Sequence, residues 1–453
     1  MHLDSAMLLS RLLCERGILM DKTILAKNVV LDGGLGVSCP NYNQIVFGGS
    51  GTGKTVSIGL ATMCHMRNSS LMATFAKRGI VNCADAFFRS LGYQTKIWNV
   101  ANPGKGETVP DPLDYVASYD DVQELAHQIA NGNPEYQRST KFDPYWREAS
   151  ESLLTGLIFY VLMTEKKPSM KKVIDLFYTM KIFENGKGIT TTLDSKIEWL
   201  EMKAPESVAA RKLRSYAQLP YATAGCVRDD LEKAIQYVFP VSIQSAMSEE
   251  AYVSFEEFAT NRTAIFIITS PVRASSYGFA NLLFGIAIRQ LMEFAESQEN
   301  NHLPKDVKLF FDDFCVAPIL NYEKAIATFR AAGISSMMLC QSLSQLDAIY
   351  GPDNSSVIMD NCSTVVYLPG GMNKKTCSYM SEIINLPLEE VMFMEMGKVI
   401  IFHSGMRPVI AQRYNTYDDP MYQKFIEAGR EKTNGKTEEN NWKSEMHTLE
   451  MRG

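Results

Sequence analysis

The chain of 453 residues lacks any apolar run that is long enough to cross a membrane as a helix. Its longest apolar stretches, residues 153–163 and 279–288, fall short of the roughly 20 residues that a spanning helix needs. The amino end carries Asp4, Arg11 and Glu15 among its leucines, which is not the pattern of a signal peptide. From these absences we expect a soluble, cytoplasmic protein.

Paired cysteines and clustered metal ligands are also missing from the sequence. The nine cysteines stand singly, without a CxxC spacing or a neighbouring histidine pair. An odd number of unpaired cysteines is typical of a reducing compartment and argues against a structural zinc site. The formal net charge of −6 excludes a polycation, so contact with a nucleic acid would need a local basic surface.

The chain does contain short apolar strands that alternate with helical patterns, which is typical of a parallel sheet in an α/β domain. The predicted strands are residues 45–47, 71–75, 95–98, 263–268, 307–311, 337–340, 364–367 and 399–403. Between about residues 119 and 241, helical periodicity replaces the strand pattern. We therefore expect one sheet domain in two parts, interrupted by an all-α insertion domain. The expected bounds are 1–118 and 245–429 for the sheet domain, 119–244 for the insertion and 430–453 for a flexible polar tail.

A glycine-rich stretch follows the first predicted strand and matches the pattern GxxxxGK[ST] at every constrained position. Its residues are Gly48, Gly49, Ser50, Gly51, Thr52, Gly53, Lys54 and Thr55. Glycines allow successive backbone amides to surround phosphate oxygens, and the following helix adds the positive end of its dipole. Lys54 can reach the β- and γ-phosphates, and the Thr55 hydroxyl can bind Mg²⁺. The flanking strand and helix disfavour a chance glycine-rich turn, so the sequence predicts a site for ATP and Mg²⁺.

Two carboxylates, Asp312 and Asp313, end the predicted strand at residues 307–311. A P-loop enzyme needs one acid for Mg²⁺ and commonly a second to orient the attacking water. We assign Asp312 to the metal and Asp313 to the water, and we expect the pair to meet Lys54 across adjacent strands. The alternative, a strand that ends in a solvated Asp-Asp turn, explains less once the phosphate loop is considered.

P-loop motor enzymes usually carry Asp-Glu at these positions, and the side chain of Asp313 is one methylene shorter than that glutamate. A misplacement on the order of 1 Å can cost about 10²-fold in rate. We therefore expect either slow hydrolysis or a compensating shift of the backbone.

Three further residues are candidates for the same site. Gln341 ends the strand at residues 337–340 and could sense the γ-phosphate, although a capped strand end is the alternative. Arg330 could act on the nucleotide of a neighbouring subunit as an arginine finger, although an exposed structural arginine explains it equally well. Lys77 follows the second strand and could contact phosphate or DNA, although a solvated loop is the preferred interpretation there.

These residues together make the chain resemble the type IV secretion coupling proteins, the TraG/TraD-like conjugative DNA-transfer ATPases. The resemblance spans about residues 40–425. It depends on the phosphate loop, the segments 111–114 and 143–146, the Asp312-Asp313 strand, residues 330–346, Asn361-Cys362 and Thr376.

The resemblance implies an α/β RecA-like P-loop domain with an all-α insertion and a homo-oligomeric ring, taken to be a hexamer with nucleotide between subunits. It further implies ATP-driven movement of single-stranded DNA, a relaxase–DNA complex as substrate, and a type IV secretion channel as partner. Two features depart from the family. The usual membrane helices are missing, which implies a soluble variant, a truncated form, or a subunit that finds its membrane anchor in another protein at the inner face of the cell membrane. Residues 75–79 also replace an acidic family segment.

Two other functions remain open from the residues alone. The chain could be a nucleotide-gated docking platform that recruits a substrate without pumping it, or a protein-secretion adaptor on the same fold. Stimulation of ATP hydrolysis by DNA would separate the motor from both alternatives.

Overall fold

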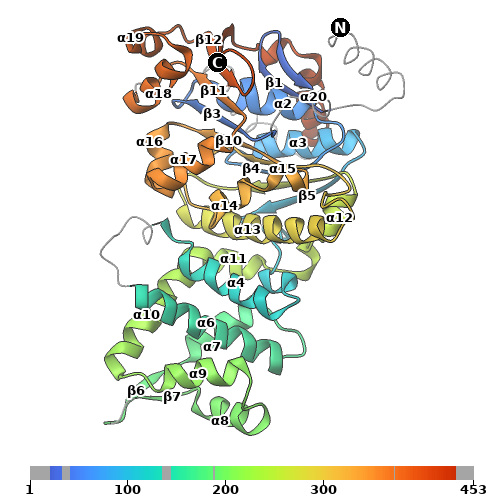
Figure 1. The fold of residues 1–453 in the computed structure, drawn as a ribbon. Helices are drawn as coiled ribbons and strands as arrows, with labels where there is room; N and C mark the ends of the chain where they lie inside the picture. Colours follow the sequence, from blue (N-terminus) through green and yellow to red (C-terminus); the bar gives the residue numbers. More distant parts are fainter. Residues whose placement is uncertain (1–20, 33–40, 135–143, 187–188, 372, 435–453) are drawn as a thin grey trace.

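The computed structural model describes five stretches of the chain (Figure 1), namely residues 21–32, 41–134, 144–186, 189–371 and 373–434. Within these stretches, no helix is both long enough and apolar enough to span a bilayer. The amino end before residue 21 lies outside the described residues, as does most of the predicted tail. The first residues of that predicted tail belong to helix α20 (Pro420–Asn434), which continues past residue 430.

A nine-stranded sheet forms the centre of the structure, in the order β13-β12-β11-β3-β10-β9-β4-β8-β5. The strands from β11 to β5 run parallel, and β12 and β13 add an antiparallel edge. Their bounds are β3 Gln44–Gly48, β4 Ser70–Phe75, β5 Gln94–Asn99, β8 Thr263–Ile268, β9 Val307–Phe311, β10 Ile334–Cys340, β11 Thr364–Leu368, β12 Lys398–His403 and β13 Val409–Gln412. Each predicted strand coincides with one of them. The sequence misses β13, whose first two side chains, Val409 and Ile410, are exposed.

The parallel strands are apolar because helices cover both faces of the sheet. One face carries α3 (Arg78–Ser90) and α20, which also pack against each other. The other face carries α13 (Ala274–Glu296), a helix in which most side chains are buried. Every residue of β3, β4, β8, β9 and β11 is buried in this layered core.

A helical segment separates β5 from β8 and lies below the sheet in Figure 1. Its helices are α4 Tyr119–Asn131, α6 Pro144–Thr164, α7 Met170–Thr179, α8 Asp194–Lys203, α9 Val208–Ala217, α10 Tyr221–Val238, α11 Val241–Ala246 and α12 Phe255–Thr260. The segment also contains a short antiparallel hairpin, β6 (Ile182–Glu184) and β7 (Ile189–Thr191), which helical periodicity does not predict. Its apolar side chains join those of α13 in one continuous core, so the segment is packed onto the sheet.

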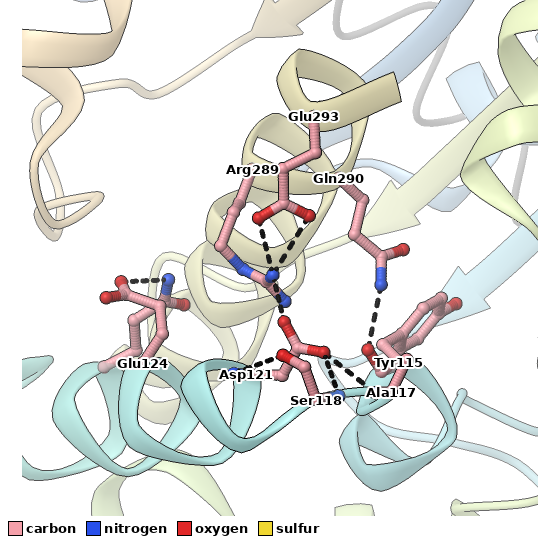
Figure 2. Close-up of polar contacts among 9 residues, drawn as sticks. Tyr115, Ala117, Ser118, Asp121, Glu124, Arg289, Gln290 and Glu293 are labelled. Carbon is pink, nitrogen blue, oxygen red and sulfur yellow. Dashed lines mark hydrogen bonds and ion pairs between the residues drawn. The ribbon is translucent and has the colours of Figure 1, made fainter. Parts of the chain in front are cut away.

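A polar cluster joins the helical segment to α13 (Figure 2). The Asp121 carboxylate accepts hydrogen bonds from the backbone amides of Ala117 and Ser118, which immediately precede α4, and from the Arg289 guanidinium of α13. Gln290 donates a hydrogen bond of 2.9 Å to the carbonyl oxygen of Tyr115. The start of α4 is therefore fixed to α13 through Asp121, which also forms the capping box of α4 with Ser118.

Candidate functional site

The phosphate loop adopts a backbone that only glycine accommodates well. Gly51 and Gly53 have φ angles of +79° and +87°, in the left-handed region that side chains disfavour. At Gly48 a Cβ atom would lie 2.6 Å from the Thr52 hydroxyl oxygen, because the chain folds closely over itself there. The motif glycines thus form a tight concave turn at the carboxyl end of β3.

Lys54 lies across this turn. Its Nζ donates hydrogen bonds of 2.6 Å and 3.0 Å to the carbonyl oxygens of Gly48 and Gly49. Burial lowers the pKa of the lysine, while the carboxylates of Asp312 and Asp313 oppose that shift. The ammonium is therefore held directly over the loop, where it can exchange these carbonyl contacts for phosphate oxygens.

The Thr55 hydroxyl donates a hydrogen bond of 2.5 Å to Oδ1 of Asp312. The two residues meet as predicted, but the predicted route across adjacent strands is wrong, since β10 lies between β3 and β9. The π-helix that follows the loop (Thr55–Leu60) bridges this gap by passing over β10. Gly59 makes the bridge possible, because a Cβ atom there would lie 2.7 Å from the Phe310 ring of β9.

The paired carboxylates have strongly perturbed acidities. Burial, followed by the charge of Asp313, raises the pKa of Asp312 to about 7, and the bonds to Thr55 and the charge of Lys54 only partly offset this. Burial also raises the pKa of Asp313, whose Oδ2 accepts a 3.3 Å hydrogen bond from the Tyr277 hydroxyl of α13. A bound cation would favour the ionised form of both acids.

The oxygen atoms of Thr55 and Asp312 suit a hard cation such as Mg²⁺. Among the described residues, no group of three or more His, Cys, Asp or Glu side chains could hold a metal by itself. Mg²⁺ characteristically takes one or two protein ligands and completes its octahedron with waters and substrate phosphates. The donor set therefore fits a magnesium ion that arrives with a phosphorylated substrate.

Gln341 and Arg330 lie at opposite ends of β10, a central strand of the sheet. Gln341 follows β10 directly and is exposed beside the phosphate loop, because Cys340 pairs with Phe47. The turn after it is fixed by a 2.9 Å hydrogen bond from the Leu343 amide to the Thr376 hydroxyl. Arg330 lies on α15 (Phe329–Ala332), which precedes β10, so the structure does not bring this exposed side chain to its own phosphate loop.

Two residues of the site, Arg413 and Tyr277, are not predicted from the sequence, and a third, Lys77, is a candidate for which a solvated loop is the preferred interpretation. A pocket of 680 Å³ extends from the phosphate loop to residues 412–417, and exposed Lys77 also lines it. Arg413 donates a 3.1 Å hydrogen bond to the carbonyl oxygen of Thr52. Arg413 and Tyr277 lie far from the motif in the sequence, and no local pattern distinguishes them. Lys77 comes shortly after a predicted strand, as Asp312 does, and this position is the one feature of the sequence that could have indicated a place in the site.

The comparisons with known proteins agree with this geometry. A family model described as type IV secretory system conjugative DNA transfer matches residues 6–385. No curated protein sequence matches the chain.

Similar solved structures include the bacterial conjugative coupling protein TrwBdeltaN70 in its unbound monoclinic form. It has a TM-score of 0.63 and 14% identity, over 88% of this chain and 90% of that chain. The plasmid coupling protein TrwB in complex with ADP and Mg²⁺ has a TM-score of 0.59 and 16% identity, over 84% and 87%. The same protein with an ATP analogue has a TM-score of 0.60 and 15% identity, also over 84% and 87%. At these identities the similarity shows a shared fold, the RecA-like P-loop architecture.

Proposed function

Because the chain belongs to the type IV secretory system conjugative DNA transfer family, we propose that it is an ATP-hydrolysing coupling protein that drives DNA into a secretion channel. The observation that supports this best is the Thr55–Asp312 contact, which joins the phosphate loop to the carboxylate strand. The similar fold of TrwB, solved with ADP and Mg²⁺, supports a magnesium nucleotide as ligand.

In this proposal the described residues divide the work of phosphoryl transfer. The amides of residues 48–55 and the Lys54 ammonium bind the phosphates, and Thr55 and Asp312 hold Mg²⁺. The metal, when bound, neutralises charge on the phosphate oxygens. Asp313, positioned by Tyr277, orients the attacking water and accepts its hydrogen bond. Gln341 stands beside the loop, where its amide can sense the γ-phosphate.

The position of Arg330 supports a ring of identical subunits. It is exposed at the amino end of β10, whereas the phosphate loop lies at the carboxyl ends of the strands, so in the proposed ring it would act on the nucleotide of another copy. A head-to-tail contact that closes into a ring brings one edge of each subunit to the other edge of its neighbour. The number of subunits that we propose, six, is the one that the resemblance to the coupling proteins implies, and residues 119–244 would form the insertion domain of each subunit.

The proposed partners follow from the family. They are single-stranded DNA or a relaxase–DNA complex, the secretion channel, and membrane-anchor subunits that hold the chain at the inner face of the cell membrane. The net charge of −6 requires any DNA contact to use local basic residues.

A nucleotide-gated docking platform is the second candidate, and one observation favours it. Burial raises the pKa of both Asp312 and Asp313, and Asp313 is a short side chain for a water-orienting role. A site of this kind could bind nucleotide firmly and hydrolyse it slowly. A protein-secretion adaptor would share that behaviour.

The test is steady-state ATP turnover with and without single-stranded DNA, measured beside oligomer size. A motor should show turnover that DNA raises and that increases with protein concentration as rings form. Lys54→Ala should abolish turnover while the oligomer and substrate binding are retained. Turnover that DNA does not change would favour the docking platform instead.

A further inference from the structure

The pocket at the phosphate loop is larger than its phosphate-binding end requires. Its volume of 680 Å³ lies in the range of about 300–1,000 Å³ that is usual for small-molecule sites. Phosphates bound at residues 50–55 would occupy one end of it. A second wall of the pocket consists of residues 412–417, which start at the last residue of β13.

This second wall is held at three points, two of which lie on the nucleotide-binding elements. The Thr416 hydroxyl donates a 2.9 Å hydrogen bond to the carbonyl oxygen of Val56, just after the phosphate loop. The Arg413 amide donates a 2.8 Å hydrogen bond to Gly397, and its guanidinium donates one to Thr52. A wall held in this way is in place before a ligand binds, which lowers the entropic cost of binding.

The side chains of the wall have the chemistry that nucleobases select. Arg413 contributes a planar guanidinium, and Tyr414 and Tyr417 contribute aromatic rings to the pocket. Tyr417 is steadied by an edge-to-face contact with Tyr422, with ring centroids 5.7 Å apart. Bases stack on such planar groups without strong dependence on which base is present.

We infer that residues 412–417 form the wall that binds the nucleoside part of the nucleotide, with Arg413 and Tyr417 contacting the base. This inference depends on the nucleotide site proposed above, and it assigns a role to a segment beyond residue 385, where the family match ends. Recognition of the base would then come from this chain's own carboxyl-terminal segment, separate from the motif that binds the phosphates.

Two ligands separate the nucleoside wall from the phosphate site, MgATP and magnesium tripolyphosphate. Their affinities would be measured by calorimetry for the full chain, for Arg413→Ala and for Tyr417→Ala. Arg407→Ala serves as the matched control, because it removes an exposed arginine from the turn at the other end of the β12–β13 hairpin. Thermal unfolding of each variant would verify that it folds.

The wild-type chain should bind MgATP at least about tenfold more tightly than tripolyphosphate, as expected if a stacking contact is made. Arg413→Ala and Tyr417→Ala should each reduce that ratio several-fold, and Arg407→Ala should leave it unchanged. The ratio is the informative quantity, because damage to the phosphate loop weakens both ligands together.

Equal affinity of the wild type for the two ligands would overturn the inference, and so would an unchanged ratio in both wall variants. Failure of the wild type to bind either ligand would instead contradict the nucleotide site itself, and the wall with it.

Discussion

Thr55 and Asp312 are joined by a 2.5 Å hydrogen bond, although they follow two strands, β3 and β9, that are separated in the sheet by β10. The contact joins the first part of the sheet domain to the second, across the whole helical segment. It depends on the π-helix after the phosphate loop, which crosses β10 on one face of the sheet. The hydroxyl and the carboxylate thereby share one small volume, where a cation can be bound by both.

Binding of the magnesium nucleotide should depend on pH. The pKa of Asp312 is raised to about 7, and Mg²⁺ binds the ionised carboxylate. Affinity for MgATP should therefore rise about tenfold from pH 5.5 to 6.5 and level off above pH 7. Calorimetry in buffers of different ionisation enthalpy would detect the released proton. The control is the affinity for ATP in EDTA, without Mg²⁺, because protonation of the nucleotide itself contributes equally to both measurements. The affinity should change less with pH in EDTA, and an equal pH dependence would contradict the prediction.

The raised pKa of Asp312 also has a cost in stability. The folded chain binds this proton more tightly than the unfolded chain, so the free energy of unfolding falls as pH rises from about 4 to 7. Between pH 5 and pH 8 this group should cost about 2–3 kcal/mol, at 1.36 kcal/mol per unit. Asp312→Asn should remove that loss and be more stable than the wild type at pH 8. Denaturant unfolding at both pH values tests this, and equal pH slopes would contradict it.

Substitution of Gly59 should be destabilising. A Cβ atom at this position would lie 2.7 Å from the Phe310 ring, so Gly59→Ala must displace the π-helix or the ring. Overpacking of this kind costs about 1–3 kcal/mol. Gly225→Ala is the matched control, since a Cβ atom there meets nothing within 4 Å and alanine favours the helix. Equal unfolding free energies for the two variants would show that the close contact is unimportant.

Asp313→Glu should lower turnover on the order of 10²-fold, because the aspartate already has the length that places its carboxylate beside the Tyr277 hydroxyl. Asp313 already accepts a hydrogen bond from Tyr277, and a longer side chain would carry the carboxylate past that hydroxyl. Turnover at saturating MgATP would be compared with nucleotide affinity, which should change little. Faster turnover would instead indicate that the aspartate is too short for its task.

The junction in Figure 2 should contribute to stability mainly through the buried pair of Arg289 with Asp121, since the second partner of Arg289, Glu293, is exposed. Arg289→Met leaves the carboxylate of Asp121, which is 9% exposed, without its cation, and should cost about 1–3 kcal/mol. Arg214→Met is the control, because Arg214 and Glu201 are about 40% exposed and such pairs contribute at most about 1 kcal/mol.

The loss should also depend on pH. Burial would raise the pKa of Asp121, but hydrogen bonds from Ala117 and the charge of Arg289 lower it. The stabilisation is therefore present above about pH 4 and disappears as pH falls through the lowered value. A variant as stable as the wild type at pH 7 would contradict this role.

The sheet could be predicted from the sequence because buried parallel strands leave continuous apolar runs, as at residues 307–311. β13 escaped prediction because it is a short edge strand whose first two side chains face solvent. The phosphate loop was predictable from its local pattern. The loop lies close to Asp312, as expected from the sequence. The sequence does not indicate that β10 lies between β3 and β9, because the order of strands in the sheet does not follow their order in the chain.

Contacts that form only in three dimensions leave no local pattern. Arg413 reaches the phosphate loop although β11 and β12 lie between β13 and β3 in the sheet, and Tyr277 reaches Asp313 because α13 begins there. Neither residue lies in a motif. The helical segment was predictable as helical, but the Asp121–Arg289 pair that fixes it depends on how α4 meets α13.

Helix α13 touches both ends of this arrangement. Tyr277 in its first turn contacts the Asp313 carboxylate, and Arg289, twelve residues later, contacts the start of α4. Twelve residues of helix span about 18 Å, and a buried helix moves as one stiff body. Through this one helix, the carboxylate beside the phosphate loop is connected to the start of the helical segment.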